Sequence, residues 1–595
     1  MTRRELLGST AAALVAGALR GTNSTAAERI TAMPSSTSRL KLHTLGYGDV
    51  TLHAGPLKSQ YDHALDVFLG LDEDRMLKVY RQAAGLDAPG QDMGGWYNAD
   101  AFAPGHCFGQ WLSALSRFAA AGSDEARAKV ARLVDAFDAT LKHGPSFYDG
   151  HRFKAYVYDK HVIGLTDAFR YAGIEHAREV LHRATESALP HLPEKALTRA
   201  EMRARPHKDH TYAWDESYTI AENLFIAHQV FGDERYLEMA KRYLHDEPYF
   251  DKLARGEHAM VGEHAYSHVN ALGSAALAYI VLGMPKHLDA LRNAWDMIEQ
   301  HHSYASGGWG PDEAFLEPGK GLLLESLRRT RKHFETPCGA YATFKHARYL
   351  TQITGESRFG DGLERMLYNG ILATKPIQPD GRTFYYSDYA DSARKTYHPE
   401  RWPCCAGTYP QATADYLIST YYHDPEGVYV NLYVPSELRW KRANGGDDVK
   451  LTQETQYPDD ERIRIRVEPS KMSEFAVNLR IPRWAEDQAR ISINGDARET
   501  TPPRAGQFAT IRRTWSPGDT VDLTLPLPFR TEPLESQHPS TVAILRGPVM
   551  YVGVSDRPAL STLTPQPSAA QQYRFVPFYK INDETYTTYF ERQGG

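Results

Sequence analysis

Cysteine is scarce in this sequence, with only four among 595 residues. A chain of this size with so few cysteines has no disulfide framework. Charge of one sign is not in excess either, because the formal net charge is only −6. This balance gives no indication of a nucleic-acid or acidic-lipid partner. No segment after the N-terminal region reaches about 18 uninterrupted apolar residues, so no membrane span is expected. A neutral or mildly polar small molecule is the expected partner.

The N-terminus has the features of an export signal. TRRELL (2–7) precedes the short apolar stretch GSTAAALVAGAL (8–19), and small residues follow at 25–27. The apolar stretch is too short to span a membrane. We therefore predict a twin-arginine-type signal over 1–27, which would direct the protein to the periplasm or outside the cell. A lead-in segment over 28–56 follows.

Helical periodicity dominates residues 57–425. Three similar phrases recur, each predicting a helix, a glycine-containing turn and a second helix: DAFRYAGIEHAREVL from Asp167, AHQVFGDERYLEMAKRYL from Ala227 and ARYLTQITGESRFGDGLERML from Ala347. Stacked helical pairs form either an open solenoid or a closed α/α barrel. The barrel is favoured, because the loops rich in histidine and aromatic residues need one common mouth to form a site.

The period changes from helical to alternating after about Gly427. Segments such as GVYVNLYV (427–434), RIRIRV (462–467) and FAVNLRI (475–481) are typical of strands separated by polar turns. Residues 426–595 are therefore predicted to form a β-sandwich region. It contains no cysteine, so the chemistry is expected in the helical part.

Two of the four cysteines are adjacent, in WPCCAGTYP (402–410). Cys404 and Cys405 pair poorly with each other, because a vicinal disulfide strains the intervening peptide. Cys338 follows Glu335 by three residues, and three thiolates with one carboxylate complete a tetrahedral Zn²⁺ shell. Cys338 as a small buried hydrophobic residue and a purely structural zinc site are alternatives. A metal-held thiolate that acts as a nucleophile is the functional interpretation.

A glycine-rich loop, GGWGPDEAF (307–315), carries Asp312 and Glu313. Paired acids in such a loop are more often solvated or calcium-binding than catalytic. An acid near a nucleophile, however, is what a double-displacement glycosidase needs. Aromatic and histidine residues, Trp96 among them, crowd other loops and suit a sugar ring, which is apolar on its faces and polar at its rim.

Together these motifs resemble one family, the β-L-arabinofuranosidases of glycoside hydrolase family 127. The resemblance covers nearly the whole mature chain. It rests on GGW (94–96), GH (105–106), LSAL (112–115), SHVNA (267–271), ETPC (335–338), LERMLYN (363–369), FYY (384–386), CC (404–405), ILRGPVMY (544–551) and FVPFYKIN (575–582).

The resemblance implies a fold and a site. The fold is an (α/α)6 barrel followed by β-sandwich domains. Cys404 would be the nucleophile and Glu313 the acid/base. The implied Zn²⁺ ligands are Glu335, Cys338, Cys404 and Cys405, and the implied sugar-pocket residues are His161, His268, Glu364 and Tyr386.

Two departures from the family pattern affect these expectations. The usual Glu-x-Cys is Glu-x-x-Cys here, because Pro337 is an extra residue, so Glu335 could approach the metal differently. The usual Cys-Cys-Pro-Pro-Asn is CCAGT (404–408) here. The second segment borders the site and therefore bears on which sugar is bound.

The predicted function is an exported retaining exo-glycosidase that removes a terminal β-L-arabinofuranosyl or related sugar from plant or microbial glycans. The alternative is a polysaccharide lyase that acts on a uronate-bearing glycan in the same barrel, with a structural zinc site, because a fold does not fix a reaction. A third possibility is a non-catalytic glycan-binding protein held together by zinc.

Overall fold

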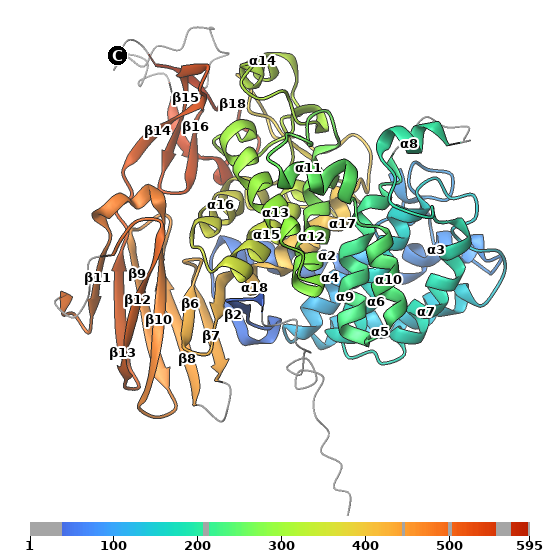
Figure 1. Ribbon diagram of the computed structural model, residues 1–595, viewed down its shortest axis with the longest axis horizontal. Coiled ribbons are helices and arrows are strands. Elements are labelled where there is room, and N and C mark those ends of the chain that lie inside the picture. The colour runs from blue at the N-terminus through green and yellow to red at the C-terminus, as the bar shows by residue number, and fades with distance from the viewer. Residues whose placement is uncertain (1–38, 206–213, 443–446, 498–502, 555–572, 593–595) are drawn as a thin grey trace, which may run out of the picture.

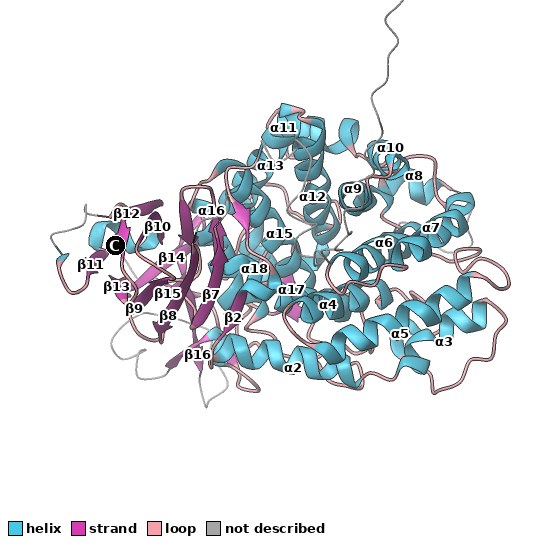
Figure 2. Ribbon diagram, turned by 90° about the horizontal axis from the view of Figure 1, so that it is seen from below, coloured by secondary structure: helices cyan, strands magenta, loops and turns pink. Residues whose placement is uncertain are grey.

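The computed structural model describes residues 39–205, 214–442, 447–497, 503–554 and 573–592 (Figure 1). The predicted signal over 1–27 lies outside the described residues. A helical unit fills one side of the molecule, and the strands gather on the other side in both views (Figures 1 and 2). This arrangement confirms the predicted fold class, a helical barrel followed by strand-rich domains.

Six helices form a closed inner ring. Each helix packs against the next, and the last packs back against the first. In ring order they are α4 (Phe108–Ala120), α6 (Lys154–Arg170), α9 (Ile220–Phe231), α12 (Ala265–Leu282), α15 (Thr336–Thr354) and α17 (Cys405–Ala414). Because the ring closes, the helical pairs form an α/α barrel and not a solenoid.

A second layer of helices surrounds this ring. Each outer helix packs mainly against one inner helix, in the pairs α4–α5, α6–α7, α9–α10, α12–α13, α15–α16 and α17–α2. The outer helices are α5 (Asp124–Leu141), α7 (Ala177–Ala188), α10 (Glu234–Arg242), α13 (Pro285–Met297), α16 (Arg358–Met366) and α2 (Pro56–Gly70). The predicted repeats are the α6–α7, α9–α10 and α15–α16 pairs. In two of them, Gly232 and Gly355 end the inner helix in the left-handed conformation that glycine permits.

Glycine also sets how closely the inner helices approach. A Cβ atom on Gly109 of α4 would lie 2.0 Å from the carbonyl oxygen of Lys160 on α6. Most residues of the inner helices are buried. One described helix, α12, is long and apolar enough to cross a membrane, but 83% of it is buried inside the protein, as expected of a barrel core helix.

Two sheets form the β-sandwich beside the barrel. Their strand orders are β1-β5-β6-β10-β12 and β11-β13-β9-β8-β7-β2. Strands β1 (His43–Thr44) and β2 (Val50–Leu52) precede the barrel in sequence, yet they pair with β5 and β7. The other strands are β5 (Tyr421–His423), β6 (Gly427–Val430), β7 (Ser436–Lys441), β8 (Asp448–Thr455), β9 (Arg462–Pro469), β10 (Ser473–Ile481), β11 (Arg490–Ile493), β12 (Gln507–Trp515) and β13 (Asp519–Thr524).

A third sheet contains β14 (Phe529–Glu535), β15 (His538–Arg546), β16 (Val549–Val554), β17 (Arg574–Pro577), β18 (Tyr586–Thr587) and β19 (Phe590–Glu591). Two tyrosines near the C-terminus connect the third sheet to barrel loops through hydrogen bonds. The Tyr589 hydroxyl accepts a hydrogen bond from the Ala305 amide at 2.8 Å, and the Tyr586 hydroxyl donates to the Asp388 carbonyl at 2.7 Å. These contacts support the loops that form the site described next.

Candidate active site

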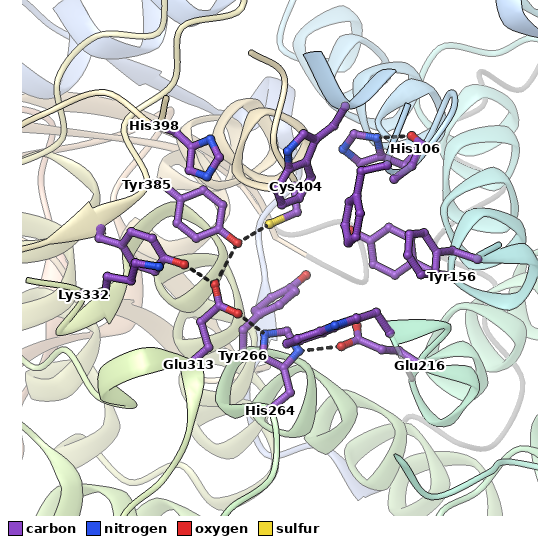
Figure 3. Close-up of a pocket in the computed structure, with 16 residues that line it drawn as sticks. His106, Tyr156, Glu216, His264, Tyr266, Glu313, Lys332, Tyr385, His398 and Cys404 are labelled. Atoms are coloured by element: carbon purple, nitrogen blue, oxygen red, sulfur yellow. Dashed lines mark hydrogen bonds and ion pairs between the residues drawn. The ribbon is translucent and has the colours of Figure 1, made fainter. Parts of the chain in front are cut away.

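A cavity of about 300 Å³ opens among the loops at one end of the barrel (Figure 3). The loop before α12, the loop before β3 (Phe334–Glu335), strand β4 (Tyr386–Ser387) and the N-terminus of α17 all contribute to it. Its lining residues are Trp96, Phe102, Ala103, His106, Phe153, Tyr156, Trp214, Glu216, His264, Tyr266, Glu313, Lys332, Tyr385, Tyr386, His398 and Cys404. Aromatic rings therefore make up much of its wall.

The predicted metal ligands meet at the base of this cavity. Their four donor atoms, from Glu335, Cys338, Cys404 and Cys405, all lie within 4.8 Å of one another. The Cys338 sulfur lies 3.6 Å from that of Cys404 and 3.4 Å from that of Cys405. The Glu335 Oε1 atom lies 3.0 Å from the Cys404 sulfur and 3.9 Å from the Cys405 sulfur.

The barrel brings these distant residues together, because α15 and α17 are neighbours in the inner ring. Glu335 is the last residue of β3, and Cys338 lies in the first turn of α15. Cys404 caps α17 and Cys405 begins it. The extra residue Pro337 lies in the first turn of α15, and the Glu335 side chain still contacts the sulfurs of Cys404 and Cys405.

These donors fit a zinc ion. Sulfur atoms about 2.3 Å from a tetrahedral Zn²⁺ would be separated by about 3.8 Å, close to the two sulfur separations above. Burial raises the pKa of all three thiols, on Cys338, Cys404 and Cys405, well above the ordinary value. Thiolates at these positions therefore need a positive charge beside them.

Glu313 faces Cys404 across the cavity. Both neighbouring tyrosines donate hydrogen bonds to its Oε1 atom, Tyr386 through a short contact and Tyr385 at 3.2 Å. The Tyr385 hydroxyl also lies 3.1 Å from the Cys404 sulfur (Figure 3). Burial, and then the charge of Glu335, raise the pKa of the Glu313 carboxyl. A raised pKa keeps the proton that a general acid must donate.

A histidine joins the acid to the cluster. The Nδ1 atom of His264 lies 2.5 Å from Glu216 Oε1, and its Nε2 atom lies 3.4 Å from Glu335 Oε2 and 3.9 Å from Glu313 Oε2. Burial disfavours the imidazolium, but Glu216 and Glu335 outweigh it and raise the pKa of His264 to about 10. Although burial opposes its ionisation, contact with His264 lowers the pKa of Glu335.

Backbone strain concentrates around the cavity. Seven non-glycine residues of the described chain have positive φ, and four of them lie in these loops: Glu216 (45°), Asp312 (52°), Glu313 (62°) and Trp402 (51°). Such conformations cost about 1–3 kcal/mol each and persist where the surroundings impose them, often at functional sites.

Two of the residues predicted to bind substrate, Trp96 and Tyr386, line the cavity. The other three do not. His161 lies inside α6 and contacts the hydroxyls of Tyr80 at 2.9 Å and Tyr148 at 2.7 Å.

His268 and Glu364 also lie away from the cavity. His268 contacts the carbonyl oxygen of His264 at 2.9 Å and packs among aromatic rings. Glu364 lies on the outer helix α16, where it pairs with Arg480 of the sandwich at 2.8 Å. The contacts of all three residues hold protein segments together.

Several cavity residues were not predicted as site residues from the sequence. His264, Glu216 and Tyr385 are central to the geometry. His264 and Glu216 lie in loops noted only for their composition, and Tyr385 lies in FYY (384–386), where the resemblance implied a role for Tyr386 alone. Nothing in the sequence marks Glu216, which follows Trp214 by two residues, as a site residue. The same is true of His264, one of two histidines in HAYSH (264–268). Their importance depends on the contacts that the fold creates.

Known proteins share this architecture. Residues 49–417 match the profile of the GH127 catalytic domain of β-L-arabinofuranosidases, and residues 427–527 match that of the GH127 middle domain. The chain belongs to glycoside hydrolase family 127. This membership indicates a glycoside hydrolase with a carbohydrate substrate, in preference to the lyase and the binding protein.

Solved structures of this family have the same fold. Ara127N-Se, a GH127 β-L-arabinofuranosidase from Geobacillus stearothermophilus T6, is 19% identical with a TM-score of 0.68, over 91% of this chain and 100% of that chain. The GH127 β-arabinofuranosidase BT3674 is 16% identical with a TM-score of 0.67, over 93% of this chain and 98% of that chain. No curated protein sequence matches the chain.

Proposed function

We propose that the protein is a retaining exo-glycosidase that removes a terminal β-L-arabinofuranosyl or related sugar, with Cys404 as nucleophile. The observation that carries this proposal is that Cys404 is the one partly exposed member of the four-residue cluster, and that it lines the cavity opposite an acid. The family profile of β-L-arabinofuranosidases and the structural relative Ara127N-Se, which is named a β-L-arabinofuranosidase, support the choice of sugar.

Zn²⁺ is the proposed cofactor, held by Glu335, Cys338, Cys404 and Cys405. When bound, it would keep the Cys404 sulfur deprotonated at neutral pH. Thr408 donates a hydrogen bond to the Cys338 sulfur at 3.2 Å, and His264 contacts the second oxygen of Glu335. Such outer contacts orient metal ligands.

The residues around the cavity support a double displacement. The Cys404 sulfur attacks the anomeric carbon while the Glu313 carboxyl donates its proton to the departing oxygen. Glu313, now a carboxylate, then takes a proton from water, which attacks the same carbon and breaks the carbon–sulfur bond. Two inversions at one carbon retain the configuration. A cavity of about 300 Å³ suits the end of a glycan chain more than its middle.

Metal content and hydrolysis test the proposal together. We expect about one zinc per chain in the wild type, less in Cys338→Ser, and release of nitrophenol from 4-nitrophenyl β-L-arabinofuranoside. Cys404→Ser and Glu313→Gln should each lower kcat by at least about 100-fold. Glu313→Gln should keep its zinc, which separates the acid from the ligands. A zinc-free wild type, or full activity in Cys404→Ser, would exclude the cysteine nucleophile.

Export through a twin-arginine-type signal is part of the same proposal. The pair Arg3–Arg4, followed by a short apolar stretch, supports it. Replacing both arginines with lysine should leave the protein in the cytoplasm of an expressing cell. Undiminished export of that variant would argue for another route.

A further inference from the structure

Lys332 ends a basic segment that lies beside the active-site cavity. The segment 328–332 reads RRTRK. Two of its arginines form ion pairs, Arg329 with Asp312 at 3.2 Å and Arg331 with Asp388 at 3.3 Å. Lys332 forms no ion pair with any described residue, and its side chain lines the active-site cavity. A cation at this place is available to a ligand.

The position of Lys332 is tied to the acid. Its carbonyl oxygen accepts a hydrogen bond from the Asp312 amide at 2.8 Å, so the lysine is joined to the residue before Glu313. Its ammonium nitrogen lies 5.2 Å from the ring centroid of Tyr386, whose hydroxyl donates to Glu313. Figure 3 shows Lys332 and Glu313 on the same side of the cavity, with Cys404 across from them.

This side of the cavity receives the leaving group. A general acid must lie beside the oxygen that departs, so the group attached to that oxygen extends past Glu313. Next to Lys332, an aromatic wall borders the same region. The His398 ring lies 4.9 Å from the Tyr385 ring and 5.5 Å from the Trp96 ring, centroid to centroid. Aromatic faces with a nearby polar group suit a sugar ring.

The remaining charged groups of the cavity explain why a cation matters there. Glu216 and Glu313 line it, and Glu335 lies beneath it. The other cation that lines the cavity, His264, already contacts Glu216 and Glu335. Lys332 is therefore the cation, among the described residues that line the cavity, that is left to pair with a negative charge on the leaving-group side.

We propose that Lys332 is a specificity-determining residue of the leaving-group subsite, which accepts a sugar or other group bearing a carboxylate. This inference rests on the proposed function. In a glycan, the corresponding leaving group is a uronic acid residue that carries the terminal sugar. The lysine is not a catalytic residue, because proton transfer belongs to Glu313.

A matched pair of substrates tests whether Lys332 favours a leaving group with a carboxylate. The 4-carboxyphenyl and 4-carbamoylphenyl β-L-arabinofuranosides have similar shape, and only the first is charged. We compare the ratio of their kcat/KM values in the wild type, Lys332→Met and Arg331→Met. Differences in leaving ability cancel when this ratio is compared between variants. Arg331 is the control, because it is a neighbouring cation that already has a carboxylate partner.

We expect the wild-type ratio to exceed that of Lys332→Met by about fivefold at low salt, since a partly exposed ion pair contributes at most about that factor. Arg331→Met should keep the wild-type ratio, and 1 M salt should abolish the difference. An equal ratio in the wild type and Lys332→Met, with both substrates hydrolysed, would overturn the inference and leave the proposed function standing. If Lys332→Met shifted the pH dependence of kcat/KM equally for both substrates, Lys332 would act on Glu313 and not on the leaving group. That result would also overturn the inference. Hydrolysis of neither substrate would overturn the proposed function and the inference with it.

Discussion

The hydroxyl of Tyr385 lies 3.1 Å from the sulfur of Cys404. The same hydroxyl lies 3.2 Å from the carboxylate of Glu313. One phenol thus spans the gap between the proposed nucleophile and the proposed acid/base, and fixes their separation. Because the Tyr385 ring is buried and packs on those of Tyr386 and His398, the hydroxyl has little freedom to move.

Tyr385→Phe should therefore impair catalysis without loss of metal. Removing one hydrogen bond to an ionisable group costs about 1.5–3 kcal/mol, so we expect kcat/KM to fall by about 10- to 100-fold. Zinc content should stay at the wild-type level, because Tyr385 is not a ligand. The control is Tyr243→Phe, which removes a buried hydroxyl that bonds the carbonyl of Pro193 away from the cavity. Equal kcat/KM values in both variants would contradict a bridging role.

The Glu216–His264 pair should make stability depend on pH. The pKa of His264 is raised to about 10 in the folded chain, against an ordinary value of 6.5. The proton is therefore bound more tightly in the folded state. The resulting stabilisation is complete below about pH 6.5 and is lost as the pH rises through about 10.

Glu216→Gln removes the charge that lies nearest to this imidazolium. We expect it to lower the melting temperature by about 2 °C or more at pH 6, and by much less at pH 10. Glu263→Gln is the control, because Glu263 lies 3.8 Å from His268, whose pKa burial lowers well below the ordinary value. A loss in Glu216→Gln that is the same at both pH values would show that the pair acts through packing alone.

The fold was largely predictable from the sequence, because it depends on periodic patterns. Alternation replaces helical spacing near Gly427, where the barrel gives way to the sheets. The grouping of Glu335 with Cys338, Cys404 and Cys405 was predictable as well, because three thiols and a carboxylate are the donors that a zinc ion accepts. The pairing of β1 and β2 with strands after the barrel was not predicted, because two or three residues carry no recognisable strand period.

The residues that line the cavity were harder to predict. His264 and His268 both occur in HAYSH (264–268), and His268 was the one predicted to bind the sugar. Only His264, which precedes the first turn of α12, faces the cavity, whereas His268 lies one turn further into the barrel wall. The position of His161 could not be predicted from the sequence either, because its partners Tyr80 and Tyr148 come from separate segments. A histidine inside a helix is satisfied by neighbours that only the tertiary structure reveals.

Glu364 allows the difference between a binding and a structural role to be measured. It is fully buried, and it accepts a hydrogen bond from the Tyr457 hydroxyl at 2.9 Å and pairs with Arg480, whose side chain is 0% exposed. Arg480 also pairs with Asp361 at 2.6 Å. These contacts join the outer barrel helix α16 to strand β10 of the sandwich.

Glu364→Gln should therefore destabilise the protein and spare catalysis. Removing one partner of a buried ion pair costs up to about 3–5 kcal/mol, and the buried Arg480 would keep only Asp361 as its carboxylate partner. The melting temperature should fall, while KM, measured well below it, should stay within about twofold of the wild type. The control is Glu299→Gln, whose partner Arg483 is 48% exposed, and which should cost less than about 1 kcal/mol. A raised KM with unchanged melting would instead return Glu364 to the sugar-binding role that the resemblance implied.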